Sequence, residues 1–396
     1  MKQTTLSIAL KATLLGASIA FAPTAFAADK ELLDILKANG SISQSQYETL
    51  LKKADTASET SALLKKMAWA GKIKIKGDLR VRQEYQTEDT GTGSGDGEDR
   101  QRYRARVGVY ADVTNNVQAG VRLASNGGAT STNETLGDGF ANDAVYFDLA
   151  YINWQPLEGL EVIGGKFKQP WEQVSGGLVW DSDVNPEGGS LRYTAKLGDA
   201  KVVATVGHLV LNDIDGFSFD EDQTIQFAQL ATNLKVGGTN TKLGVSLYEY
   251  DEDKLAGLIS GGGNDSTEYS ISEIFGETTV NIGLPVKLYG QYAKNNDANG
   301  VNSGEDTAWL LGAETKVGSW KASYDYRETD LNAVNGAFND SDFAGGRTDA
   351  EGHRLKLSYK IDKNFSIGTT YFKTEVGDLN GDLDVDTWQI DLKAKF

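Results

Sequence analysis

The chain has 396 residues, no cysteine, a formal net charge of −17 at pH 7 and a mean hydropathy of −0.38. The lack of cysteine excludes disulfides, thiol nucleophiles and most zinc sites, and the only histidines are His208 and His353. The acidic balance argues against nucleic acid as a partner, because its phosphates would repel the chain.

Residues 1–27 have the pattern of a cleaved export signal. Lys2 precedes a mostly apolar run over residues 6–22, which Lys11 interrupts, and residues 25–27 (Ala-Phe-Ala) fit the small-x-small cleavage rule. An uncleaved membrane anchor is the alternative, but the run is short for that role. No later segment has the roughly 18 apolar residues that a transmembrane helix needs. A closed β-barrel, in contrast, crosses a membrane without such a run.

Residues 28–70 have a helical pattern that differs from everything after them. Leu32 and Leu36 fall on one stripe, and Ser43 with Gln46 has the spacing of a capping box at the start of a helix. We interpret these residues as a small periplasmic helical segment. A flexible leader to the following domain is the alternative.

From residue 71 to residue 396 the apolar pattern changes to a period of two, which is typical of β-strands. The expected short turns are 114–116, 155–159, 198–199, 235–240, 282–285, 317–319 and 361–364, and the expected long loops are 86–99, 125–143, 169–189, 211–222, 251–267, 295–305, 329–351 and 375–384. Seven short turns and eight long loops join sixteen strands and leave both ends on the short-turn side. This alternation is characteristic of bacterial outer-membrane barrels. We therefore predict an all-β fold, a transmembrane antiparallel β-barrel of about 16 strands, in preference to a soluble β-sandwich.

The final strand shows the pattern most clearly. Apolar side chains alternate from Trp388 to Phe396, and Gln389, Asp391 and Lys393 lie between them on the opposite face. A closing strand that ends in phenylalanine is familiar in outer-membrane barrels. We expect Phe396 to serve as an assembly signal.

Basic side chains recur on the face that would point into the barrel. The predicted pore-lining residues are Arg80, Arg82, Arg102, Arg104, Arg106, Arg122, Lys166, Lys168, Arg192 and Lys196. Arginine stays charged and binds carboxylates in a fixed fork, so this set indicates a pore that prefers anions, and carboxylates among them. The alternative is a constriction loop, the third long loop, whose Asp181, Asp183 and Glu187 face the arginines. That arrangement gives a transverse field without strong selectivity.

Three parts of the sequence resemble a known family. They are residues 164–170 (GGKFKQP) followed by 178–188 (LVWDSDVNPEG), residues 283–286 (GLPV) leading into 288–295, and residues 339–343 (NDSDF) before 348–352 (TDAEG). With the helix pair at 32–53, they resemble the Gram-negative "putative porin" family. The resemblance implies an outer-membrane channel for passive diffusion of small hydrophilic solutes, without a cofactor, that forms a homotrimer. It does not name the solute. We also expect contacts with outer-membrane lipid and lipopolysaccharide.

Signals for metal binding and catalysis are weak. Asp378, Asn380, Asp382 and Asp384 have the spacing of the start of a calcium loop, but no distal glutamate follows, and a hairpin tip explains them equally well. No metal site and no catalytic residue is therefore predicted.

Two other functions stay open beside a channel. One is a structural barrel whose helices within 28–70 contact peptidoglycan. The other is a lipid hydrolase, which would need a Ser–His pair such as Ser358 with His353. Conductance in planar bilayers distinguishes a channel from both.

Overall fold

The computed structural model describes residues 33–34, 37–38, 42–52, 70–90, 97–212, 223–251 and 262–396. The chain divides into two compact units, Met1–Gly71 and Lys72–Phe396. The predicted export signal lies outside the described residues. Among those that are described, no helix has both the length and the apolar character needed to cross a membrane.

The first unit contains a helix over residues 44–52. The side-chain oxygen of Gln46 accepts a hydrogen bond from the Ser43 backbone N–H at 2.9 Å, and the Ser43 hydroxyl accepts one from the Gln46 N–H at 3.3 Å. These two bonds are the predicted capping box. The Lys37 ammonium lies 4.6 Å from the centre of the Tyr47 ring, so Lys37 contacts this helix.

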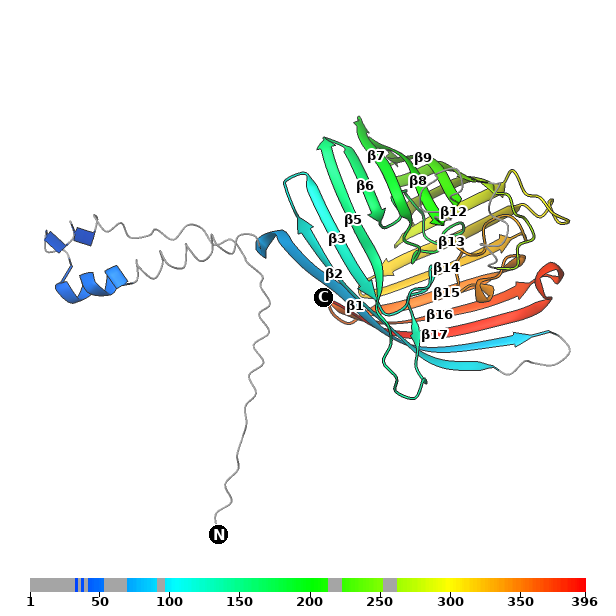
Figure 1. Cartoon of the computed structure of the whole chain (residues 1–396), viewed down its shortest axis with the longest axis horizontal. Helices are drawn as coiled ribbons and strands as arrows, with labels where there is room; N and C mark the ends of the chain where they lie inside the picture. The colour runs from blue at the N-terminus through cyan, green and yellow to red at the C-terminus, as the bar shows by residue number, and fades with distance from the viewer. Residues whose placement is uncertain are drawn as a thin grey trace, which may run out of the picture. The chain divides into compact units, whose positions relative to one another are not determined.

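The second unit is a closed antiparallel β-barrel (Figure 1). Its strands are β1 (Ile73–Asp89), β2 (Glu98–Asp112), β3 (Val117–Ala124), β4 (Glu134–Thr135), β5 (Tyr146–Leu157), β6 (Leu160–Lys166), β7 (Glu187–Leu197), β8 (Ala200–Asn212), β9 (Gln223–Val236), β10 (Thr239–Tyr250), β11 (Ser270–Asn281), β12 (Pro285–Asn295), β13 (Thr307–Val317), β14 (Trp320–Thr329), β15 (Ala350–Lys360), β16 (Phe365–Val376) and β17 (Leu383–Lys395). The two-residue strand β4 belongs to a long loop and pairs with β2. The other sixteen form the wall, which confirms the predicted fold.

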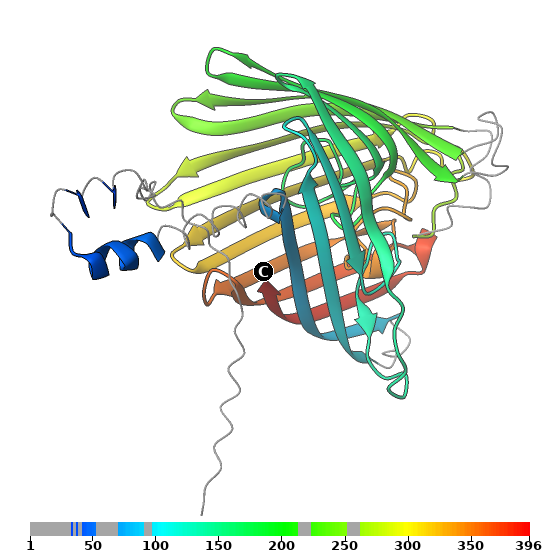
Figure 2. The ribbon, with the colours of Figure 1, turned by 60° about the vertical axis from the view of Figure 1, so that its left-hand side comes forward.

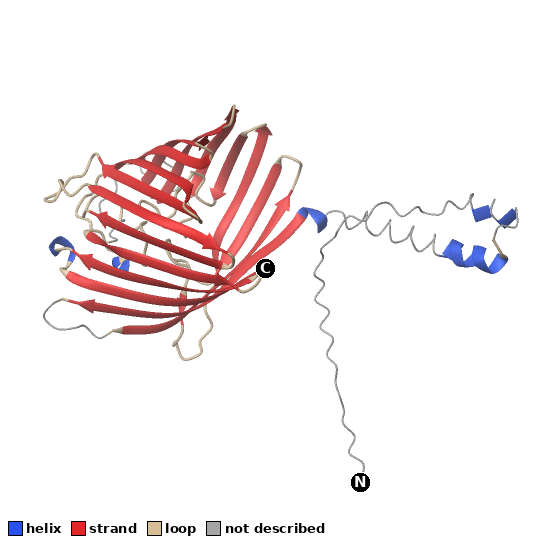
Figure 3. Ribbon diagram, turned by 180° about the vertical axis from the view of Figure 1, so that it is seen from behind, coloured by secondary structure: helices blue, strands red, loops and turns tan. Residues whose placement is uncertain are grey.

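Short and long connections alternate around the barrel as predicted. Figure 3 shows the strands as a continuous wall with only short helical pieces beside it. These pieces are η1 (Ala70–Lys72), η3 (Ala344–Gly346) and η4 (Asp378–Asn380). Three long loops matter below, and we call them L2 (125–145), L3 (167–186) and L7 (330–349).

The barrel closes between its first and last strands (Figure 2). Strands β1 and β17 pair from Asp78 opposite Lys395 to Asp89 opposite Asp384. Phe396 extends this ladder, because its backbone N–H and C=O each bond to Gly77 at 3.0 Å. A side chain at position 77 would place its Cβ 2.4 Å from the Phe396 ring, so the close approach requires glycine there.

Side chains alternate across the wall. Along β17, Ile390 and Leu392 are exposed on the outer face, whereas Gln389 and Asp391 are buried inside. The same alternation runs through the other wall strands, so exposed leucine, valine and isoleucine side chains surround the barrel. An apolar outer band of this kind is stable against lipid chains and would be unfavourable in water.

One side of the barrel interior is filled by an apolar core. Trp171 and Trp180 of L3 lie with ring centres 5.2 Å apart and pack against Phe227 of β9 and Tyr248 of β10. Phe338 of L7 stacks on Trp180 at 5.5 Å. L3 and L7 therefore fold inward together and occupy the space beside strands β8 to β13.

Candidate functional site

The interior space that the apolar core leaves open is a cavity of about 610 Å³, which we call the central cavity. Strands β1, β2 and β15 to β17 line it on one side, and residues of L2, L3 and L7 line it on the other. Its charged lining residues are Arg80, Arg82, Arg104, Arg106, Lys168, Arg354, Lys356, Lys393, Asp181, Asp183, Asp340, Asp342 and Asp391. Eight of these are cationic and five are carboxyls.

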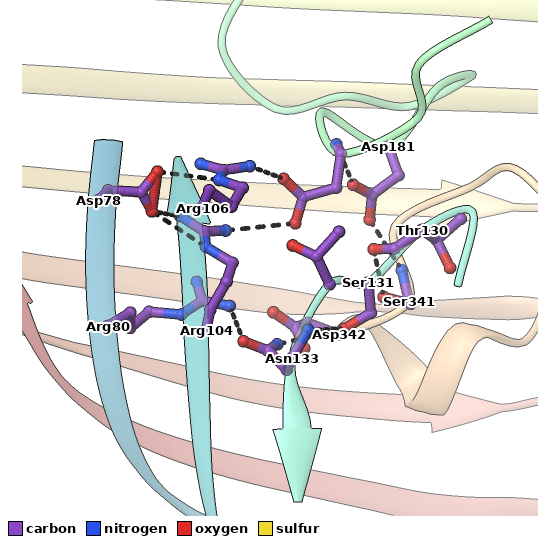
Figure 4. A network of polar contacts seen from close by, with 12 residues as sticks. Asp78, Arg80, Arg104, Arg106, Thr130, Ser131, Asn133, Asp181, Ser341 and Asp342 are labelled. Carbon is purple, nitrogen blue, oxygen red and sulfur yellow. Dashed lines mark hydrogen bonds and ion pairs between the residues drawn. The ribbon is translucent and has the colours of Figure 1, made fainter. Parts of the chain in front are cut away.

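Strand register brings the arginines of β1 and β2 together. Arg80 lies directly opposite Arg104, and Arg82 lies directly opposite Arg102. Like charges that face each other across a ladder destabilise a sheet unless counter-charges separate them. Carboxylates supply that separation for most of the row (Figure 4).

Arg104 and Arg106 are held between two carboxylates. Asp78 of β1 pairs with Arg104 at 3.0 Å and with Arg106 at 2.8 Å. Asp183 of L3 approaches the same two guanidinium groups at 3.4 Å and 3.1 Å. An acid of the third long loop thus faces the arginine row, in the arrangement that a transverse field requires.

Arg82 is the most enclosed member of the row, with 3% of its surface exposed. It pairs with Asp391 of β17 at 2.8 Å, with Glu84 at 3.2 Å and with Asp342 of L7 at 3.1 Å. Arg102 also pairs with Glu84, at 3.3 Å. The charge of Arg82 is therefore compensated several times over.

A second infolded loop, L7, was not predicted from the sequence. Its Asp340 pairs with Arg354 of β15 at 2.8 Å and with Arg327 of β14 at 3.2 Å. Both arginines also donate to the Gly176 carbonyl of L3 at 3.1 Å. The signal was present in the Asn-Asp-Ser-Asp-Phe stretch at 339–343, which sequence reasoning used only as a family resemblance.

Asp181 joins the two infolded loops. Its N–H donates to the Phe338 carbonyl at 2.7 Å, and its carboxyl accepts from the N–H groups of Ser341 at 3.2 Å and Asp183 at 2.7 Å. Burial raises the pKa of Asp181 to about 8, and the nearby Asp340 carboxylate adds to the shift. Asp181 is therefore mostly protonated at neutral pH.

The remaining predicted residues lie around the wall. Arg122 pairs with Asp148 of β5, and Arg192 of β7 pairs with Glu172 of L3 at 2.5 Å. Lys196 is exposed near the 198–199 turn. None of the three lines the central cavity.

Lys166 and Glu187 form an ion pair with each other at 2.6 Å, between the end of β6 and the start of β7. Both side chains are partly or fully exposed, and neither lines the central cavity. Unlike Asp183, neither Asp181 nor Glu187 pairs with an arginine of β1 or β2 in the described ranges.

Three cavity-lining cations have no carboxylate within ion-pair distance in the ranges that the structure describes: Arg80, Lys168 and Lys356. Arg80 donates to the Asn133 amide oxygen of L2, while its Nε is buried without a partner. The two lysines are exposed toward the cavity. Enclosure by the wall lowers the pKa of Lys168 to about 8, and the neighbouring Arg122 and Arg106 add to this effect.

The residues of the weak calcium motif make contacts within the protein. Asp378–Asn380 forms the short helix η4, and the Asn380 amide donates to the carbonyls of Gly262 and of Thr348, the latter at 2.8 Å. Within the described ranges, no group of three or more acidic or histidine side chains is arranged to hold a metal ion.

The possible Ser–His pair is not formed. His353 and Ser358 are five residues apart on β15, so they point to opposite faces of the wall. The His353 ring contacts the Tyr324 hydroxyl at 2.8 Å instead.

Comparison with known proteins supports the barrel fold. The chain resembles the Pseudomonas putida OprB structure solved at high pH, with 12% identity, a TM-score of 0.56, and coverage of 85% of this chain and 97% of that one. A triple mutant of the Rhodopseudomonas blastica porin is also similar, with 12% identity, a TM-score of 0.49, and coverage of 82% of this chain and 100% of that one. No curated protein matches the sequence. Residues 91–260 and 266–396 match the family described as "Putative porin". The chain belongs to the putative porin family, whose members are outer-membrane channels.

Proposed function

We propose that this porin lets small hydrophilic solutes diffuse through the central cavity and that it prefers anions. The observation that carries the proposal is the uncompensated positive charge of the cavity lining. Most of the arginine row is neutralised by carboxylates, but Arg80, Lys168 and Lys356 are not. Fixed charge of one sign in a narrow pore of low dielectric raises the local concentration of the opposite ion.

This proposal assigns the selectivity to two of the ten predicted pore-lining residues, Arg80 and Lys168, and to Lys356, which was not predicted. Arg82 and Arg104 also belong to the predicted set, yet each shares its charge with two or more carboxylates. A compensated pair contributes little net field at the distance of a passing ion, because its two charges nearly cancel. The unpaired lysines contribute their full charge.

A planar bilayer experiment tests the preference. The reversal potential of the wild-type channel in a KCl gradient should show chloride passing more readily than potassium. One unit charge about 10 Å from an ion changes its energy by about 0.4 kcal/mol at the dielectric constant of water, or about twofold in permeability. Because chloride and potassium respond in opposite directions, each removed charge changes their permeability ratio by about fourfold, and the double variant Lys168→Gln/Lys356→Gln should lower the chloride-to-potassium ratio by about sixteenfold.

Lys196→Gln provides the matched control, because it removes the same charge outside the central cavity. It should change the ratio less than either single cavity variant. A second candidate function is a general porin with a transverse field, which the Asp183 contacts with Arg104 and Arg106 favour. A wild-type channel without anion preference, and unchanged in the double variant, would support that alternative.

The remaining assignments concern export and assembly. We propose that residues 1–27 are removed during export, that residues 28–70 stay in the periplasm, and that the barrel forms a homotrimer in contact with lipopolysaccharide. Their support is the family membership and the export pattern of the sequence. Mass spectrometry of the mature chain and its mass in detergent test the first and third points. A chain lacking 30–66 that stays trimeric would exclude a role of the helical segment in assembly.

A further inference from the structure

The three uncompensated cations enter the central cavity from separate parts of the barrel. Arg80 is on β1, Lys356 is on β15, and Lys168 lies two residues after the end of β6. Going around the wall from β15 through β1 to β6, six strands lie between the two ends: β16, β17, β1, β2, β3 and β5. Because the wall has sixteen strands, β6 and β15 lie on nearly opposite sides of the barrel. Arg80 comes from the wall between them.

This spacing discriminates between anions. A monovalent anion or a compact oxyanion contacts one such cation at a time, because its charge is concentrated at one point. A solute with two separated carboxylates can pair with cations on two sides of the cavity at once. Simultaneous pairing gives a higher affinity than either contact alone, provided the solute spans the distance.

Four of the five carboxyls that line the cavity pair with its other cations, and the fifth, Asp181, is mostly protonated at neutral pH. Neutral hydrogen-bonding side chains, among them Ser131, Asn133, Ser182 and Gln389, line the space between the cations. The aromatic rings of Trp180 and Phe372 also border the cavity, but both side chains are almost fully buried and present little apolar surface. A cavity of about 610 Å³ holds a small dicarboxylate together with hydration water, since one water occupies about 30 Å³.

Arg80 is the most enclosed of the three cations. Its side chain is 8% exposed, and its Nε–H has no hydrogen-bond acceptor in the described part of the chain. A buried charged donor without an acceptor is unfavourable. Because Arg80 lines the central cavity, its uncompensated charge attracts a carboxylate there.

We propose that the central cavity is a saturable binding site for small solutes with two or more separated carboxylates, in which Arg80, Lys168 and Lys356 are the specificity-determining residues. This inference rests on the proposed anion preference and adds a solute class and a binding step. Passage through the pore then approaches a maximum rate as the dicarboxylate concentration rises.

The test uses the full-length channel in planar bilayers at constant KCl. Succinate, acetate and inorganic phosphate are added separately to one side, and the decrease in chloride current gives the half-saturating concentration of each. Succinate should reduce the current at a concentration roughly tenfold or more below acetate, as one additional charged hydrogen bond would produce. Phosphate should resemble acetate more than succinate, because its charges are not separated.

Variants assign the effect to the cavity. Lys168→Gln and Lys356→Gln should each raise the half-saturating concentration of succinate by roughly tenfold and change that of acetate much less. Lys363→Gln is the matched control, because it removes the same charge in the exposed 361–364 turn and should leave both values unchanged. Recovery of the heat-stable barrel on gels confirms that each variant is folded.

The outcomes separate this inference from the proposed function. Equal half-saturating concentrations for succinate, acetate and phosphate would overturn the binding site, even where the reversal potential still shows anion preference. Tight succinate binding that neither lysine variant weakens would overturn the assignment of residues. A channel without anion preference contradicts the proposed function, and that result comes from KCl alone, before any solute is added.

Discussion

The two sides of the barrel interior have the same strand pattern and opposite properties. Beside strands β8 to β13, inward side chains such as Phe227 and Tyr248 are buried under L3 and form an apolar core. Beside β1, β2 and β15 to β17, inward side chains such as Arg80 and Lys356 face the open cavity. An inward position therefore becomes core or pore depending on which long loop covers it. The strand alternation alone does not distinguish the two.

The backbone of L3 is tied to the packed side by polar side chains of the wall. Gln229 accepts from the Glu172 N–H at 2.6 Å and donates to its carbonyl at 3.0 Å, and Gln291 accepts from the Leu178 N–H at 3.0 Å. Lys242 donates to the Gln173 carbonyl at 2.9 Å. These bonds satisfy loop backbone groups that would otherwise be buried without partners. The packed side therefore holds L3 in place, while Asp183 of L3 pairs with arginines on the charged side.

The largest effect should come from breaking the charge network of the open side. Arg82→Ala leaves the buried Asp391 without its main partner and removes one of the three arginines that pair with Glu84, which should cost about 3–5 kcal/mol of unfolding free energy. Urea unfolding in detergent micelles, followed by gel mobility, measures the loss. Lys356→Gln on the same side is the control, because this lysine pairs with no carboxylate in the described part of the chain and its replacement should change stability little. Equal stability of the two variants would contradict the network.

A comparable but smaller effect is expected from the packed side. Trp180→Ala removes contacts with Trp171, Tyr248 and Phe338 and should cost about 3 kcal/mol, near the lower end for such truncations, because a loop can partly collapse into the space. The Trp180 ring of L3 stacks on Phe338 of L7, so its removal should loosen both infolded loops and raise the single-channel conductance. Trp320→Ala is the control, as this outward side chain packs only on the barrel surface against Tyr359. Unchanged conductance in Trp180→Ala would show that the loops are held without the core.

A third effect concerns the seam that closes the charged side. Gly77→Ala places a methyl group against the Phe396 ring and should cost about 1–3 kcal/mol through overpacking. Deletion of Phe396 should reduce the amount of barrel in the outer membrane more than it alters conductance. Gly71→Ala is the control, because nothing lies within 4 Å of a Cβ there. A normal yield after deletion of Phe396 would exclude it as an assembly signal.

The smallest effect is a pH dependence of selectivity. Both the pKa of Lys168 and that of Asp181 lie at about 8, so from pH 6 to pH 9 Lys168 loses its positive charge and Asp181 gains a negative one. Both changes disfavour anions. The chloride-to-potassium permeability ratio should therefore fall by about sixteenfold over this range, because each unit charge changes the permeability of each ion by about twofold and in opposite directions.

The charged surroundings of these two groups are the same network described above. Lys168 is influenced by Arg122, Arg106 and Asp183, and Asp181 is influenced by Asp340 and Asp183. The variant Lys168→Gln/Asp181→Asn should lose most of the pH dependence in reversal-potential measurements. A change of about sixteenfold that persists in this variant would place the titrating groups elsewhere.

Sequence reasoning located the strands and turns correctly because barrel geometry is local. The alternation of Trp388, Ile390 and Leu392 with Gln389 and Asp391 follows from the pleat of a single strand, and the structure places each group on the predicted face. The seven short turns are the observed ones, with boundaries shifted by a few residues. The Ser43–Gln46 capping box is equally local, and it is present.

The candidate site could be predicted only in part. Arg102, Arg104 and Arg106 share a face by their spacing, and Asp183 does meet two arginines of the row. The pairing of Arg82 with Asp391 could not be seen, because these residues are 309 positions apart and meet only when β17 closes against β1. The same closure adds Arg354, Lys356 and Lys393 to the cavity.

The sequence by itself therefore determined the sixteen-stranded barrel, its two faces and the basic character of its interior, since these depend on the period of side chains along each strand. Only the tertiary structure decided which interior charges are compensated. The infolding of L3 and L7 and the closure of the seam set those distances, and electrostatic energy depends on distance and burial, which a linear pattern does not contain. As a result, Arg80, Lys168 and Lys356 are the cavity-lining cations without a carboxylate partner among the residues that the structure describes.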